Sequence, residues 1–261
     1  MSVPYSQIRD QLRTCDLILF RSHDLVSSLI AEFEKYSNGD GDFTHVGMCI
    51  RGESFYYPDP KTTPPWLKRD GLYLLEAGAS GICGSVFDVE GKSGLCVQLR
   101  DLDQVVCTYK QSSLDKMAVM YLKEEFRSKE LDKDSMVLQR EYDKYRGLYY
   151  DLSLIDLWAT VLPFARTIRD NYIYKHVCDY LAGKFIGTQR SSSTDHPELL
   201  PRDNVHSNWQ FCSKLVSNIY IDLALFSKLV VPSNVTPSDL VVRPESKCLP
   251  SIFEPIIYFD P

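Results

Sequence analysis

The sequence predicts an α+β protein in which an antiparallel sheet packs against a helix that begins at Cys212. Three observations predict this fold class. Short apolar runs of strand length occur early in the chain, at residues 16–20, 43–50 and 72–77. Apolar residues then recur at helical spacing from Cys212 onward. The chain has 261 residues and is 44% hydrophobic, which is enough for a sizeable core.

The length and composition predict a single domain, residues 1–261, with helical and loop insertions at approximately 110–205. Within that region, residues 114–126 carry apolar side chains at helical spacing and predict an amphipathic helix. Residues 151–186 also read as largely helical. Residues 191–208 are polar and contain prolines, so we expect an exposed loop there.

Most of the predicted strands lie in the first part of the chain. Residues 16–20 form a continuous apolar run that is typical of a buried strand. Residues 25–33 instead carry apolar side chains at helical spacing. Residues 72–77 predict a strand that ends at Gly78, and residues 97–99 predict a further one. We expect these strands to pair into a sheet that curls towards a barrel.

The strand predicted at residues 43–50 carries a histidine on one face. Its apolar side chains alternate, so they share one face and His45 points to the opposite one. Cys49 lies four residues further on and therefore shares the face of His45. Cys49 is a second candidate thiol, ranked below Cys212 because no helix begins there.

Charge and hydropathy argue against two classes of partner. The formal net charge is −6 at pH 7, and the basic residues are dispersed, so the sequence offers no basic surface for nucleic acid. The longest apolar stretch, residues 152–164, is shorter than the roughly 20 residues of a spanning helix. We expect no nucleic-acid partner and no transmembrane segment, while peripheral contact with a membrane stays open.

The cysteine pattern predicts free thiols in a reducing compartment. The eight cysteines are spread along the chain, and no two are spaced as C-x-x-C, so we expect no structural zinc site. The amino-terminal residues lack the basic and apolar segments of a secretory signal. We therefore expect an intracellular, cytoplasmic protein.

Cys212 is the candidate nucleophile because of its place at a predicted helix start. Unpaired backbone N–H groups and the helix dipole favour a thiolate over a thiol at such a position. The same N–H groups can hold a developing oxyanion. His45 is a candidate for the imidazole that completes a nucleophile pair.

Six separated pieces of the sequence carry a resemblance to a known superfamily. They are CDLILFR at 15–21, THVG at 44–47, LEA at 75–77, YRGLYYD at 145–151, FCSKLV at 211–216 and VTPSDL at 235–240. In type and order they resemble the permuted branch of the NlpC/P60 papain-like superfamily. That branch includes bacterial YiiX/YebB-type proteins, poxviral relatives and, more distantly, lecithin:retinol acyltransferases.

The resemblance implies a circularly permuted papain-like fold and a cysteine hydrolase that needs no metal or organic cofactor. By this resemblance Cys212 is the nucleophile, His45 is the general base and Glu76 is the carboxylate that orients the imidazole. The implied substrate is an amide, in a peptide or an amino-acid-linked compound, which is cleaved through an acyl-enzyme. The resemblance to poxviral relatives implies a second location for a protein of viral source, namely association with the virion.

Two alternatives to an amide hydrolase remain open at this stage. Three positions depart from the superfamily pattern, namely Cys15, Phe211 and Lys214, but none of them belongs to the implied triad. The first alternative is a lipid acyltransferase or thioesterase on the same fold, with residues 152–164 lining an acyl groove. The second is a non-catalytic binding module in which Cys212 is buried and inert.

Overall fold

The computed structural model describes residues 2–21, 43–59, 61–80, 86–92, 94–110, 116–148, 211–241 and 252–261. The strands are β1 (Val3–Pro4), β2 (Leu17–Arg21), β3 (His45–Arg51), β4 (Leu72–Ser80), β5 (Gly94–Asp101), β6 (Lys116–Met120) and β7 (Ile257–Asp260). The helices are α1 (Tyr5–Ile8), α3 (Leu102–Lys110), α4 (Lys129–Asp132), α5 (Met136–Tyr145), α9 (Cys212–Asp222) and α10 (Pro237–Leu240). The helices predicted at residues 25–33 and 151–186 and the loop predicted at 191–208 lie outside the described residues.

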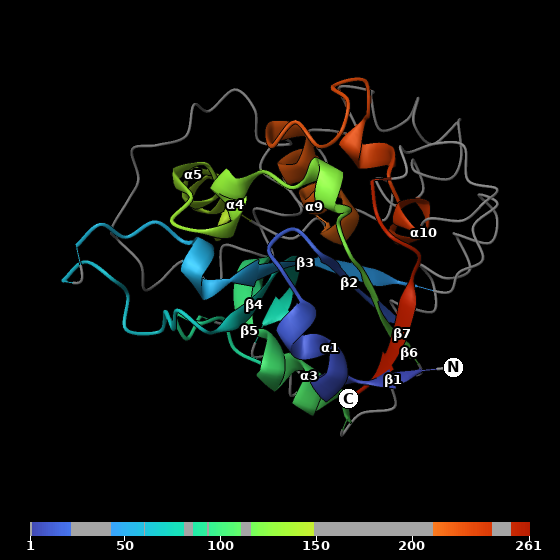
Figure 1. The fold of residues 1–261 in the computed structure, drawn as a ribbon, viewed down its shortest axis with the longest axis horizontal. Helices are drawn as coiled ribbons and strands as arrows, with labels where there is room; N and C mark the ends of the chain where they lie inside the picture. Colours follow the sequence, from blue (N-terminus) through green and yellow to red (C-terminus); the bar gives the residue numbers. More distant parts are fainter. Residues whose placement is uncertain are drawn as a thin grey trace, which may run out of the picture.

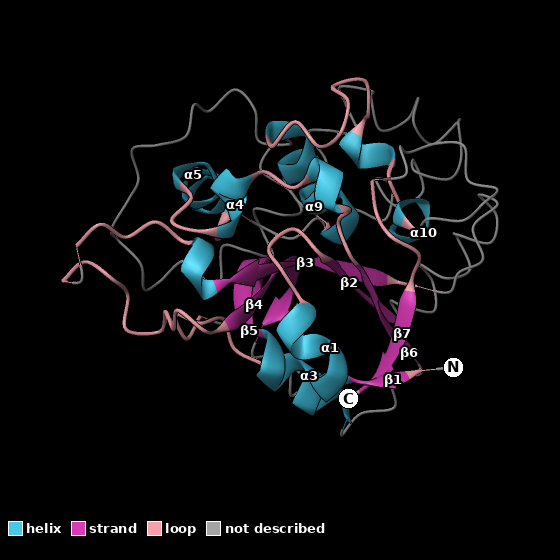
Figure 2. Ribbon diagram, viewed as in Figure 1, coloured by secondary structure: helices cyan, strands magenta, loops and turns pink. Residues whose placement is uncertain are grey.

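The strands form one seven-stranded sheet with the order β1-β7-β6-β2-β3-β4-β5. The predicted α+β class is confirmed. The sheet is mixed rather than wholly antiparallel, because β1 and β7 pair in parallel while the other neighbours are antiparallel. The sheet is curved, with α1 and α3 inside the curve and α4, α5, α9 and α10 on the other side (Figure 1). Figure 2 shows the same two layers of helix around the strands.

Each face of the sheet buries its own hydrophobic cluster. The larger cluster joins Val46 of β3 to residues of α9 such as Leu215. The smaller cluster joins Phe20 of β2 to residues of α3 such as Val105. Strands in the middle of the sheet are consequently buried on both faces, which explains their continuous apolar runs.

The prediction of a helix at residues 114–126 is wrong, because residues 116–120 form β6, which lies between β2 and β7 in the sheet. Met117 and Val119 belong to the smaller cluster, whereas Ala118 and Met120 belong to the larger one. A strand buried on both faces has no polar alternation, so its apolar residues also match a helical spacing. Part of the segment expected to be an insertion thus lies inside the sheet.

The other strand predictions are confirmed, with one change at the end of β4. Residues 16–20, 43–50 and 97–99 fall largely within β2, β3 and β5. β4 continues through Gly78 to Ser80, so the prediction that Gly78 ends the strand is wrong. Gly78 pairs with Cys96 of β5, and this ladder continues to the end of β4. A glycine weakens a strand but does not stop it where a neighbouring strand supplies the ladder.

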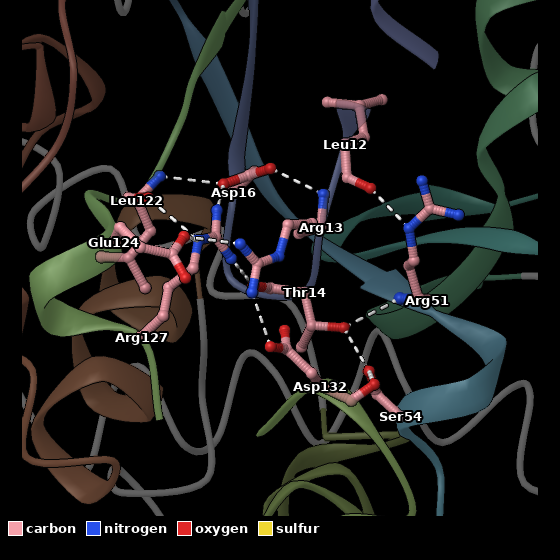
Figure 3. Close-up of polar contacts among 10 residues, drawn as sticks. All are labelled: Leu12, Arg13, Thr14, Asp16, Arg51, Ser54, Leu122, Glu124, Arg127 and Asp132. Atoms are coloured by element: carbon pink, nitrogen blue, oxygen red, sulfur yellow. Dashed lines mark hydrogen bonds and ion pairs between the residues drawn. The ribbon is translucent and has the colours of Figure 1, made fainter. Parts of the chain in front are cut away.

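A buried carboxylate fixes the start of β2 to the connection after β6 (Figure 3). Asp16 forms an ion pair with Arg127 and accepts hydrogen bonds from the backbone N–H groups of Leu122 at 2.8 Å and Arg13 at 2.7 Å. Arg127 also donates to the carbonyl oxygen of Thr14 at 2.8 Å. Burial raises the pKa of Asp16 to about 6, although Arg127 and the two N–H groups act in the opposite direction. Asp16 therefore has a structural role.

A second group of contacts in Figure 3 fixes the end of β3. The hydroxyl of Thr14 accepts from the backbone N–H of Arg51 at 3.0 Å and hydrogen bonds with the Ser54 hydroxyl at 2.6 Å. The guanidinium of Arg51 donates to the carbonyl oxygen of Leu12 at 2.6 Å. β3 is thus anchored at the end opposite to His45.

Gly47 allows β3 and β4 to approach closely beside His45. A Cβ atom at position 47 would lie 2.6 Å from Leu74 Cδ1 and 3.2 Å from Glu76 Cβ. Both distances are shorter than ordinary contacts between carbon atoms. The absence of a side chain at Gly47 therefore leaves room for the side chain of Glu76.

Replacing Gly47 by Ala should lower the free energy of unfolding by about 1–3 kcal/mol, the usual cost of overpacking a core. Gly78→Ala is the matched control, because the nearest atom to a Cβ at position 78, Gln98 Nε2, is 3.4 Å away. We expect Gly78→Ala to be nearly neutral. Urea unfolding curves of the two variants measure the difference, and equal losses would contradict the packing role of Gly47.

Candidate active site

Cys212 is the first residue of α9, which confirms the predicted helix start. The preceding residue, Phe211, has an extended backbone (φ −106°, ψ 167°) and contributes no side-chain cap. The N-cap residue therefore offers no side-chain acceptor to the backbone N–H groups in the first turn of α9. Cys212 is 3% exposed.

Ser213 and the segment before α10 hold the start of α9 in place. The Ser213 hydroxyl donates to the carbonyl oxygen of Val235 at 2.6 Å. The next residue, Thr236, forms a capping box with Asp239: its hydroxyl accepts from the Asp239 N–H, and the Asp239 carboxylate accepts from the Thr236 N–H. Two of the six sequence segments that carry the resemblance, residues 211–216 and 235–240, are therefore in direct contact.

His45 is the first residue of β3 and lies between Glu76 and Cys212. Its Nε2 atom is 2.6 Å from Oε2 of Glu76 on β4. Cys212 lies close enough to the same imidazole to raise the pKa of His45. Because Nε2 is occupied by Glu76, Nδ1 is the ring nitrogen left for the sulfur. The structure thus brings together all three residues that the sequence singled out.

The imidazole is also held by its neighbour across the β2–β3 ladder. Phe20 pairs with His45 in the ladder, and the two ring centroids are 5.8 Å apart. The side chain of His45 is 20% exposed, whereas that of Glu76 is fully buried. A carboxylate on one side and a phenyl ring on another leave the imidazole little freedom to rotate.

The surroundings of His45 and Glu76 favour the charged form of both side chains. Burial alone lowers the pKa of His45, but the carboxylate of Glu76 and the charge and hydrogen bond of Cys212 raise it to about 10. Burial favours the neutral form of Glu76, but Arg100 and His45 outweigh it and hold the pKa of Glu76 below its usual range. At neutral pH the pair is therefore an imidazolium and a carboxylate.

Two residues of β5 complete the surroundings of Glu76, and the sequence analysis did not name them. The Arg100 guanidinium forms an ion pair with Oε1 of Glu76. The side-chain amide of Gln98 lies 3.5 Å from the same oxygen. These two polar residues stand two apart in β5, with apolar Val97 and Leu99 beside them, so they share a face. That spacing is the signal that could have identified them.

Cys49 and Cys15 do not fit the role of nucleophile. Cys49 is fully buried in the smaller cluster. Burial, followed by the charge of Asp16, raises the pKa of Cys49 well above its ordinary value. The same two causes raise the pKa of Cys15 to about 12. Both thiols are therefore protonated at neutral pH, and a protonated thiol is a poor nucleophile.

Comparisons with known proteins do not assign the chain to a family. No protein-family model matches the sequence, and no curated protein matches it. Within the part of the chain that the structure describes, no helix is long and apolar enough to cross a membrane. The same residues contain no group of three or more His, Cys, Asp or Glu side chains arranged to hold a metal ion. The case for a function therefore depends on the geometry around His45.

Replacing Glu76 by Gln should lower the pKa of His45 from about 10 towards the ordinary value of about 6.5, because the partly buried imidazolium loses its main counter-charge. The measurement is an NMR titration of the His45 ring Cε1–H signal, assigned with a His45→Gln variant. Glu141→Gln is the control, since Glu141 is a buried carboxylate on α5. A His45 pKa that stays unchanged in Glu76→Gln would contradict this account of the site.

Proposed function

We propose that the protein is a cysteine hydrolase that cleaves an amide bond in a peptide or an amino-acid-linked compound. One observation carries the proposal: the imidazole of His45 is held between a buried carboxylate and a cysteine at a helix start. In such an arrangement the carboxylate orients the imidazole, and the imidazole acts as the base that activates the thiol. In this role Cys212 is the nucleophile, His45 the acid and base, and Glu76 the orienting residue.

The first half of the proposed reaction forms an acyl-enzyme. The Cys212 sulfur attacks the amide carbonyl carbon, and the carbonyl oxygen takes the negative charge. Backbone N–H groups in the first turn of α9 stabilise that oxyanion. The carbon–nitrogen bond then breaks, and the His45 imidazolium gives its proton to the departing amine. A thioester on Cys212 remains.

The second half of the reaction releases the acid. His45, now neutral, takes a proton from a water molecule as the water oxygen attacks the thioester carbonyl. The carbon–sulfur bond breaks, a carboxylic acid leaves, and the thiolate and imidazolium are restored. Glu76 stays ionised throughout, since its part is to hold one imidazole tautomer and stabilise the imidazolium.

We further propose that the fold is the circularly permuted papain-like fold. Three features support it: the histidine precedes the cysteine in the chain, His45 and Glu76 lie on adjacent strands, and α9 packs on both of those strands. The five free cysteines among the described residues agree with action in a reducing, intracellular compartment.

One observation favours the non-catalytic alternative. Cys212 is only 3% exposed, as a structural thiol would be. A purely structural thiol, however, has no need of an imidazole that is itself held by a buried carboxylate. Thiol chemistry and substrate turnover separate the two accounts.

Iodoacetamide at neutral pH should label Cys212 although its side chain is buried, because the adjacent imidazole of His45 activates the sulfur. The exposed Cys107 serves as the internal comparison. His45→Ala should slow the labelling of Cys212 and leave that of Cys107 unchanged, because the imidazole that activates the Cys212 sulfur is lost. Site-resolved mass spectrometry gives both labelling rates. Labelling of Cys107 alone would favour the binding module.

Turnover of a fluorogenic peptide library should disappear in Cys212→Ala and fall by about 10²–10⁴-fold in His45→Ala, the usual contribution of acid–base catalysis. Cys107→Ala is the control and should keep full activity. A fatty-acyl ester tested beside the peptides distinguishes an amidase from an acyltransferase or thioesterase. Hydrolysis that survives in Cys212→Ala would overturn the assignment of the nucleophile.

A further inference from the structure

We propose that Arg100 is a positioning residue that keeps Glu76 ionised and turns one of its oxygens towards His45. This inference rests on the proposed function for its catalytic meaning, but its test needs no substrate. The two oxygens of Glu76 have different partners: Oε1 meets the Arg100 guanidinium, and Oε2 lies 2.6 Å from His45 Nε2. The carboxylate is therefore oriented from both sides.

Burial makes this arrangement depend on Arg100. The side chain of Glu76 is 0% exposed and that of Arg100 is 6% exposed. A carboxylate removed from water stays charged only when nearby cations and hydrogen bonds replace its hydration. In the described part of the chain, those partners are Arg100 from β5, His45 from β3 and the amide of Gln98.

Stability alone does not account for the pair. A buried ion pair is often no more stabilising than apolar residues of the same volume. Here Arg100 Nε and Gln98 Oε1 are buried and make no hydrogen bond within the described residues, which adds to the cost. The Arg100–Glu76 pair costs free energy and lies beside His45, a candidate catalytic residue. Its effect on His45 therefore explains the pair better than stability does.

The effect follows from the charges that face the Glu76–His45 pair. In the described structure the charged group is Arg100 on β5, the other titratable group is the Cys212 thiol on α9, and Gln98 is uncharged. Without Arg100, burial would be opposed only by His45 and the amide of Gln98, so Glu76 would take up a proton at a higher pH. A protonated Glu76 can no longer accept the Nε2–H hydrogen bond in the same way, and the imidazole loses its fixed tautomer.

The test is an NMR titration of the Glu76 side-chain carboxyl carbon, assigned with Glu76→Gln. In Arg100→Gln we expect the midpoint to rise by about 1–3 pH units, the usual effect of one adjacent opposite charge. In Arg100→Lys, which keeps the charge, the rise should be smaller. The low-field proton signal of the His45–Glu76 hydrogen bond should weaken in Arg100→Gln and return in Arg100→Lys.

The matched control is Arg127→Gln. Arg127 and Asp16 form another buried arginine–carboxylate pair, with side chains 5% and 0% exposed. This variant should lose stability but leave the Glu76 midpoint and the His45 proton signal unchanged. A merely structural Arg100 would behave in the same way as Arg127.

Several results would overturn the inference. One is a Glu76 midpoint that does not move in Arg100→Gln, even if the protein proves to be a hydrolase. Another is a failure of both Arg100 variants to fold while Arg127→Gln folds, which would make Arg100 structural. If the midpoint moves as expected and no substrate is ever cleaved, the positioning role stands and the proposed hydrolase function fails.

Discussion

The buried carboxylate of Glu76 is the constraint on which the rest of the candidate site depends. It lies on β4, with His45 on the neighbouring β3 and Arg100 on the neighbouring β5. A charge at 0% exposure must be matched by partners within the protein. Both adjacent strands supply a basic group, so the pairing of three strands and the charge state of the site are linked.

The cysteine reaches this carboxylate system from the far end of the chain. α9 packs on β3 and β4, and the bond from Ser213 to Val235 fixes its first turn. The capping box between Thr236 and Asp239 in turn fixes the backbone at the residue after Val235. The placement of one sulfur atom thus depends on short-range capping chemistry as much as on the core beneath the helix.

The sequence predicted those parts of the structure that have a local pattern. β2, β3 and the start of α9 were found because apolar spacing and length agree there. β6 was mistaken for a helix because a strand buried on both faces carries no alternation, and only the pairing with β2 and β7 reveals it. Arg100 was missed because its partner Glu76 lies diagonally across the β4–β5 ladder, and only the register of the two strands shows this. The approach of His45 to Cys212 came from the resemblance, since no spacing in the chain implies it.

The shifted pKa values fix the pH range over which the pair contributes to stability. The folded pKa of His45 is raised, to about 10, so its contribution is complete below its unfolded pKa of about 6.5 and is lost as pH rises through 10. The folded pKa of Glu76 is lowered, so its contribution is present above its unfolded pKa of about 4.3 and is lost in acid. Between these unfolded values both contributions are complete, and at neutral pH the ion pair is still formed. An enzyme built on this pair would therefore have its imidazole already charged, and its general base would appear only after the imidazolium has given its proton to the leaving group.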